Sequence, residues 1–207
     1  MQRSKGSRLF PLFVIIIILA LAVAAVVSIG RAVFNRAEPT QTEEVVDAGR
    51  DSLLNTSLSR SVSMTVRGPI VADEVFKSYK IVISPGKRQM DVYTGYLDER
   101  TGGKTFSNNT PSYEQFIHAL DKANMMKGEV PKDDDANDLR GICATGYVHE
   151  FAVLNDDQSI KRLWTSTCKG SQGSLDASKD QLSNLFLVQI PDSQKLIPFK
   201  EALKLSF

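Results

Sequence analysis

Two cysteines, Cys143 and Cys168, are the residues of this chain whose type and spacing first suggest chemistry. The strand-like segments GYVHEFAVL and SIKRLWTSTC flank the turn-like NDDQ and predict a β-hairpin. A turn centred between Asn155 and Asp156 sets the cysteines opposite each other, and a turn centred one residue later leaves them diagonal on the same side. We therefore predict a structural Cys143–Cys168 disulfide. The alternatives are two reduced buried thiols, or a redox or metal site, for which C-x-x-C or more ligands would be typical.

The first of these registers brings three aromatic side chains, a histidine and an arginine onto one face of the hairpin. In it His149 lies opposite Arg162, and such a pair on an aromatic face could hold an anion or a carboxylate. The alternative is that the aromatic residues belong to the core and the two polar residues meet solvent at a sheet edge. The candidate binding face comprises Tyr147, His149, Phe151, Arg162 and Trp164.

Other motifs that could carry chemistry are incomplete. Asp133, Asp135 and Asn137 have the alternate spacing of a calcium loop, but the sixth position lacks Gly and the twelfth lacks Glu, so a solvated charged segment is the better interpretation. The TGGK at 101–104 lacks the spacing of a phosphate-binding loop. The second histidine, His118, has no catalytic triad context. The sequence therefore predicts no catalytic, cofactor-binding or metal-binding residue, and no cofactor.

An uncharged segment of 22 residues, 9–30, has the length of a transmembrane helix. Three basic residues lie in 1–8, and Arg31 and Arg36 follow the segment, a small bias that places the N-terminus in the cytoplasm. We predict a basic cytoplasmic N-terminus over 1–8, a single-pass anchor in the lipid bilayer over 9–30, and an extracytoplasmic remainder. A cleaved signal peptide is the alternative, although its apolar region is usually shorter.

Charge divides the chain into two parts. Residues 1–36 contain five of the 25 Lys and Arg residues and no acid, so 37–207 contain 20 basic and 24 acidic residues, a formal net charge of −4. A mildly acidic domain is a poor nucleic-acid binder, and we expect no nucleic-acid partner. Residues 31–59 have the composition of a stalk or linker, and TEEVVDAGRDSLL within it is a short helix or a solvated spacer. The extracytoplasmic domain is then 60–207.

The pattern along 60–207 predicts an α+β fold. Alternating apolar residues begin at Val62, and KSYKIVIS and RQMDVYTGY flank Pro85-Gly86 as a second hairpin. A two-residue turn there would set Ile81 opposite Met90 and Tyr79 opposite Val92. Helices are expected after a Thr110 cap and after an Asp176 or Ser178 cap. We predict a two-layer sandwich of antiparallel β-hairpins with about two helices packed on one face.

Four segments, VRGPIVADEVFKSYKIVIS, YEQFIHALDKANMM, LRGICATGYVHEF and LWTSTCKGSQGSL, resemble uncharacterised single-pass, membrane-anchored envelope proteins of small-genome bacteria over about 60–195. That resemblance implies no assigned activity. Type IV pilins also pair a basic leader and Gly with an apolar helix and a disulfide. Here Pro11 stands where their pattern has Glu, and Arg8 lies inside the expected mature start.

These observations together predict a membrane-anchored extracytoplasmic module that binds or supports a partner without catalysis. The expected partner is an envelope or surface protein, or a cell-wall component. An envelope enzyme with an unrecognised active site and a pilin-like surface subunit are the alternatives. A deep pocket with convergent polar groups would favour the enzyme, and an exposed apolar patch would favour the binding module.

Overall fold

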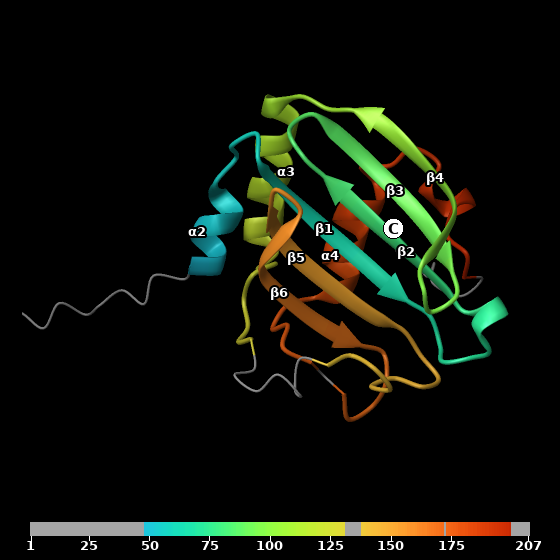
Figure 1. Ribbon diagram of the computed structural model, residues 1–207. Coiled ribbons are helices and arrows are strands. Elements are labelled where there is room, and N and C mark those ends of the chain that lie inside the picture. Colours follow the sequence, from blue (N-terminus) through green and yellow to red (C-terminus); the bar gives the residue numbers. More distant parts are fainter. Residues whose placement is uncertain (1–47, 131–137, 172, 200–207) are drawn as a thin grey trace, which may run out of the picture. The chain divides into compact units, whose positions relative to one another are not determined.

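The computed structural model of the chain describes residues 48–130, 138–171 and 173–199 (Figure 1). The predicted cytoplasmic N-terminus at 1–8, the predicted transmembrane helix at 9–30 and the first part of the predicted stalk, 31–47, lie outside the described residues. Within the described part, no helix combines the length and the apolar character needed to cross a membrane.

Six antiparallel strands form one sheet, in the order β4-β3-β2-β1-β5-β6. Because β1 pairs with both β2 and β5, the predicted hairpins are joined into a single layer. The α+β class is therefore confirmed. The strands are β1 (Arg60–Arg67), β2 (Lys77–Ile83), β3 (Lys87–Thr94), β4 (Glu99–Ser107), β5 (Val148–Asn155) and β6 (Gln158–Ser166).

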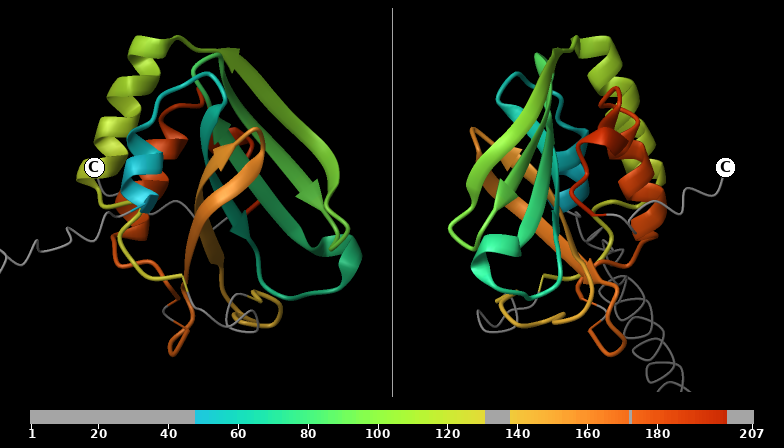
Figure 2. Two further views of the ribbon diagram at one scale, coloured as in Figure 1. Left: turned by 60° about the vertical axis from the view of Figure 1, so that its left-hand side comes forward. Right: turned by 90° about the vertical axis from the view of Figure 1, so that its right-hand side faces the viewer.

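Helices pack on one face of this sheet and make the second layer (Figure 2). In Figure 1 the sheet is seen from the other face, with α3 and α4 behind it. The described helices are α2 (Ala48–Leu54), α3 (Thr110–Lys122) and α4 (Lys179–Leu187), with short 3-10 turns η2 (Asp73–Val75) and η4 (Ser193–Lys195). The core between the layers is fully buried at Met64, Tyr79, Ile81, Ile83, Met90, Tyr113, Ile117, Leu120, Phe151, Leu182 and Phe186.

The helix starts are close to those expected. Ser178 caps α4, and its Oγ accepts a hydrogen bond from the Gln181 amide at 3.3 Å, as predicted. For α3 the cap is Asn109 and not Thr110: its Oδ1 accepts from the Ser112 amide at 2.9 Å. Asn109 is extended and so can occupy the non-helical cap position one residue earlier.

The β2–β3 hairpin has the predicted register. Ile81 pairs with Met90 and Tyr79 pairs with Val92 across a two-residue connection at Pro85-Gly86. One strand was missing from the prediction, since β4 follows directly and pairs with β3. Its sequence ERTGGKTFS lacks alternation because β4 is an edge strand whose residues are mostly exposed.

The helix α2 belongs to the globular domain and not to a stalk. Leu53 is fully buried in the core cluster, and α2 contacts α3, β5 and β6. Arg50 on α2 donates from Nε and Nη2 to the Asp121 carboxylate on α3, at 2.7 and 3.0 Å. These hydrogen bonds lower the pKa of Asp121. The domain boundary expected at residue 60 is therefore too late, because one buried leucine gives too short an apolar stripe to identify from sequence.

The pair between α2 and α3 yields a measurable prediction. A double-mutant cycle with Arg50→Ala and Asp121→Ala should give a coupling energy of about 0.5–1 kcal/mol, as expected for a two-bond pair at the surface. Unfolding of the full chain can be followed by fluorescence of Trp164, its single tryptophan. A coupling energy near zero would contradict the docking of α2 on α3.

Candidate functional site

The β5–β6 hairpin differs from both registers considered for it. Its two loop residues are Asp156 and Asp157, both with positive φ, and Asn155 pairs with Gln158. This is the turn centred one residue later. Beyond it a β-bulge at Ile160 shifts the register, so that Glu150 pairs with Trp164. Adjacent acids tolerate the left-handed conformation of such a tight turn, but neither the turn centre nor the bulge has a distinct sequence pattern.

Because a bulge adds one residue to one strand, it reverses the face of every later side chain on that strand. The predicted binding face is therefore divided between the two faces of the sheet, which corrects the prediction. Phe151 and Tyr147 pack in or against the core on the helix side, together with His149 near α4. Arg162 lies on the other face beside Glu150, and Trp164 lies in a second small cluster with Val148. We call this other side the second face, defined by Arg67, Glu150, Arg162 and Trp164.

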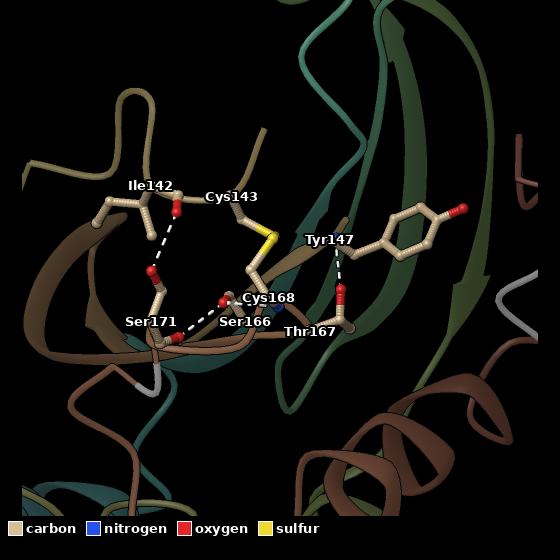
Figure 3. Close-up of a disulfide and its surroundings, with 7 residues drawn as sticks. All are labelled: Ile142, Cys143, Tyr147, Ser166, Thr167, Cys168 and Ser171. Atoms are coloured by element: carbon tan, nitrogen blue, oxygen red, sulfur yellow. Dashed lines mark hydrogen bonds between the residues drawn. A yellow bond between two sulfur atoms is a disulfide. The ribbon is translucent and has the colours of Figure 1, made fainter. Parts of the chain in front are cut away.

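The predicted disulfide between Cys143 and Cys168 is present, with a Cα–Cα distance of 5.5 Å. It lies just beyond the paired ends of β5 and β6 and not within the ladder. Hydrogen bonds surround it (Figure 3): Ser171 Oγ donates to the Ile142 carbonyl at 3.1 Å, and Thr167 Oγ1 accepts from the Tyr147 amide at 2.8 Å. The Tyr147 ring points away from the disulfide toward the helix side.

His149 lies between the sheet and α4, where its Nδ1 is 3.5 Å from Ser183 Oγ. Burial, and secondarily the charge of Lys179, lower its pKa from 6.5 to about 4, while Asp180 opposes the shift. The histidine is therefore neutral at physiological pH. It lies on the helix side of the sheet, whereas Arg162 lies on the second face, so the two residues do not form the anion site considered above.

A pocket of about 650 Å³ lies on the second face, where β1 ends and β5 begins. This volume falls within the range of small-ligand sites, roughly 300–1,000 Å³. Its lining combines arginines and acids with aliphatic and aromatic side chains. The lining includes Arg67, Ile70, Phe76, Tyr96, Asp138, Arg140, Ile142, Val148, Glu150 and Arg162.

Several connections hold one wall of the pocket, the segment 138–147. The disulfide ties Cys143 to the end of β6. The Ile70 amide donates to the Ala144 carbonyl at 2.9 Å, which joins this segment to the β1–β2 connection. Ser171 holds the Ile142 carbonyl from the other side. The wall therefore depends on contacts between parts of the chain that are distant in sequence.

Glu150 forms the charged floor of the pocket. Its side chain is only 9% exposed, and Arg67 Nε and Arg162 Nη1 approach its two carboxylate oxygens at 3.0 and 3.4 Å. Burial of this carboxylate is compatible with its charge because two guanidinium groups accompany it. Glu150 was not identified from the sequence, since only the bulge brings Arg162 to the same face.

The rim of the pocket contains a second ion pair and an aromatic pair. Arg140 Nε donates to the Asp138 carboxylate at 2.8 Å, and this contact lowers the pKa of Asp138 to about 2. Phe76 stacks on Tyr96 with ring centroids 4.1 Å apart. The Tyr96 hydroxyl donates to the Val71 carbonyl at 2.8 Å, so the aromatic pair is fixed to the β1–β2 connection.

No cluster of metal-ligating side chains occurs among the residues that the structure describes. Asp133, Asp135 and Asn137, the residues with calcium-loop spacing, lie outside the described residues. Both cysteine sulfurs are used in the disulfide, which leaves no described thiol for a metal or for redox exchange with a second described cysteine.

The fold and the pocket together define an α+β domain whose single antiparallel sheet carries a mixed-charge pocket on the face opposite its helices. No protein-family model matches the chain, and no curated protein matches it.

Proposed function

We propose that the chain is a membrane-anchored, extracytoplasmic binding module that holds its ligand in the pocket on the second face. The pocket is the observation that carries this proposal. Both described acids of its lining are paired with arginines, and all three arginines of the described lining are paired with these acids, so the polar groups of the pocket are held in ion pairs. The expected ligand belongs to an envelope or surface protein or to a cell-wall component, and not to nucleic acid.

The proposed location has two supports. Residues 9–30 have the length and the uncharged composition of a membrane span, with three basic residues in 1–8 before it and two, Arg31 and Arg36, close after it. The Cys143–Cys168 disulfide is of a kind that persists outside the reducing cytoplasm. Alkylation of protein in intact native cells, followed by non-reducing mass spectrometry, tests this location. Free, alkylated thiols on both cysteines would overturn it.

Blocking the pocket should prevent ligand binding. Ile70 lines the pocket and is 47% exposed, so Ile70→Trp adds bulk to the site without changing the core. Leu97→Trp is the matched control, since Leu97 is 96% exposed and does not line the pocket. We expect a molecule that co-purifies with the wild-type full chain from native membranes to decrease about tenfold in Ile70→Trp, a loss of about 1.4 kcal/mol.

The same molecule should co-purify unchanged with Leu97→Trp, as measured by mass spectrometry of the denatured, filtered preparations. Equal recovery from all three proteins would contradict binding in this pocket. Binding in this pocket would also be contradicted if no molecule co-purified specifically with the wild type and Leu97→Trp.

A further inference from the structure

Arg67 is a pocket residue that keeps part of its hydrogen-bonding capacity unused. Its Nε donates to Glu150, and its two terminal amino groups have no hydrogen-bond partner within the described part of the chain. The side chain is 43% exposed and lines the pocket. A guanidinium group held at Nε in this way retains donors that can meet a planar, two-oxygen acceptor.

Glu150 fixes the position of Arg67. The carboxylate is buried in the floor of the pocket, so it has little freedom to follow a moving guanidinium group. Arg162 contacts its second oxygen and restrains it further. An arginine anchored at one end loses less conformational entropy when it binds a ligand, which favours affinity.

The charge of the pocket favours a single negative charge on the ligand. Among the described lining residues, Arg67, Arg140 and Arg162 are opposed by Asp138 and Glu150, which leaves one excess positive charge in that part of the lining. A phosphate carries nearly two negative charges and would lie beside these two carboxylates. A carboxylate carries one charge and matches the geometry of a guanidinium group with two parallel hydrogen bonds.

The remaining lining indicates what the carboxylate is attached to. Ile70, Phe76, Ile142 and Val148 supply an apolar surface in the same pocket as Arg67. Asp138 lies on the rim, where Arg140 donates to both of its carboxylate oxygens, and its negative charge favours ligand N–H groups nearby. An apolar side chain next to a carboxylate, followed by amide N–H groups, is the chemistry of a peptide C-terminus.

We propose that this pocket binds the C-terminal carboxylate of a short peptide, with Arg67 contacting the carboxylate and Glu150 positioning Arg67. The proposal rests on the proposed function, because it names the ligand class of the same pocket. The apolar residues then hold the last side chain of the peptide. The volume of about 650 Å³ admits only a few residues.

The test uses the full chain in detergent micelles and a defined probe. The probe is an equimolar mixture of N-acetylated tripeptides that end in Ala, Val, Leu or Phe and carry a free C-terminal carboxylate. A second mixture of the same tripeptides as C-terminal amides is the comparison. Binding is measured by ligand-observed NMR, and the dissociation constant is then determined for the tripeptide with the strongest signal. We expect the free carboxylate to bind roughly 10- to 100-fold more tightly than its amide, since hydrogen bonds to charged groups contribute about 1.5–3 kcal/mol.

Three variants test the role of Arg67. Arg67→Gln should weaken binding of the free carboxylate by roughly 10- to 100-fold and leave binding of the amide unchanged. Arg67→Lys retains the charge without the two-pronged donor, so its affinity for the free carboxylate should lie between those of the wild type and Arg67→Gln. Arg100→Gln is the matched control, because Arg100 pairs with Asp91 at 2.7 Å and lies outside the pocket lining. It should bind like the wild type.

The role of Glu150 is separated from simple charge by Glu150→Gln. Removing this negative charge makes the pocket more positive, so charge alone would increase the preference for carboxylate over amide. Loss of the positioning contact at Arg67 would decrease that preference, which is the result we expect. An increased preference would overturn the positioning role.

Failure of this proposal is distinguishable from failure of the proposed function. Suppose that carboxylates and amides bind equally well and that Ile70→Trp abolishes this binding. That result would overturn carboxylate recognition but retain the pocket as a binding site. Absence of tripeptide binding, with a co-purified molecule still lost in Ile70→Trp, would also overturn only the peptide ligand. Absence of both effects would overturn both proposals.

Discussion

Replacing both cysteines with serine is expected to lower the free energy of unfolding of the full chain by about 3 kcal/mol. The disulfide joins Cys143 to Cys168 across a sequence separation of 25, and the whole β5–β6 hairpin lies within that loop. Closing the loop limits the conformations of the unfolded chain, and the variant loses that restriction. Urea unfolding followed by Trp164 fluorescence measures the difference, because Trp164 is the single tryptophan and is buried beside Cys143.

The same variant should also lose binding in the pocket. Without the disulfide, the segment 138–147 is tied to the rest of the domain by hydrogen bonds such as Ile70–Ala144 and Ser171–Ile142 and by packing of Leu139 and Ile142 near Trp164. Dithiothreitol should therefore weaken binding to the wild type and have no further effect on the double-serine variant. An unfolding free energy within about 0.5 kcal/mol of the wild type would contradict the structural role of this bond.

The β2–β3 and β5–β6 hairpins show why the sheet was predictable in part. In the first, apolar alternation and the Pro85-Gly86 turn specify the same register, and that register is observed. In the second, several polar residues can occupy the turn, and a bulge at Ile160 then changes the register without an obvious local pattern. Sequence alternation predicts which residues share a face only while the strand has no extra residue.

The candidate pocket was predictable to a smaller extent. Its walls come from the end of β1, the β1–β2 connection, the β3–β4 turn, the segment before β5, the start of β5 and the middle of β6. Arg162, one of the residues singled out from the sequence, lines the pocket, but its expected neighbour, His149, lies on the opposite face. Arg67 and Glu150 are far apart in sequence, and only the β1–β5 pairing brings them together. Pairing between distant strands has no fixed sequence spacing, so no motif could have identified them.

Acidification should destabilise the domain between pH 6.5 and pH 4 because of His149. Burial lowers the pKa of this histidine to about 4 in the folded chain, while in the unfolded chain it is about 6.5. Within this window the unfolded chain binds a proton that the folded chain does not, so stability falls as pH falls. The loss is about 1.4 kcal/mol per pH unit and about 3 kcal/mol in total. Well above pH 6.5 the histidine is neutral in both states and contributes no pH dependence.

The two histidines of the chain provide a matched pair of variants for this measurement. His149→Gln should remove most of the slope of the unfolding free energy between pH 6.5 and pH 4.5, and His118→Gln, at an exposed position of α3, should retain it. The carboxyl groups of Asp121 and Asp192 have lowered pKa values, so their stabilising contributions decline only below about pH 4 and fall outside this range.

Because protonation of His149 acts through burial beside α4 and not through the second face, ligand affinity in the pocket should remain constant as long as the domain is folded. An unchanged slope in His149→Gln would show that another group causes the pH dependence.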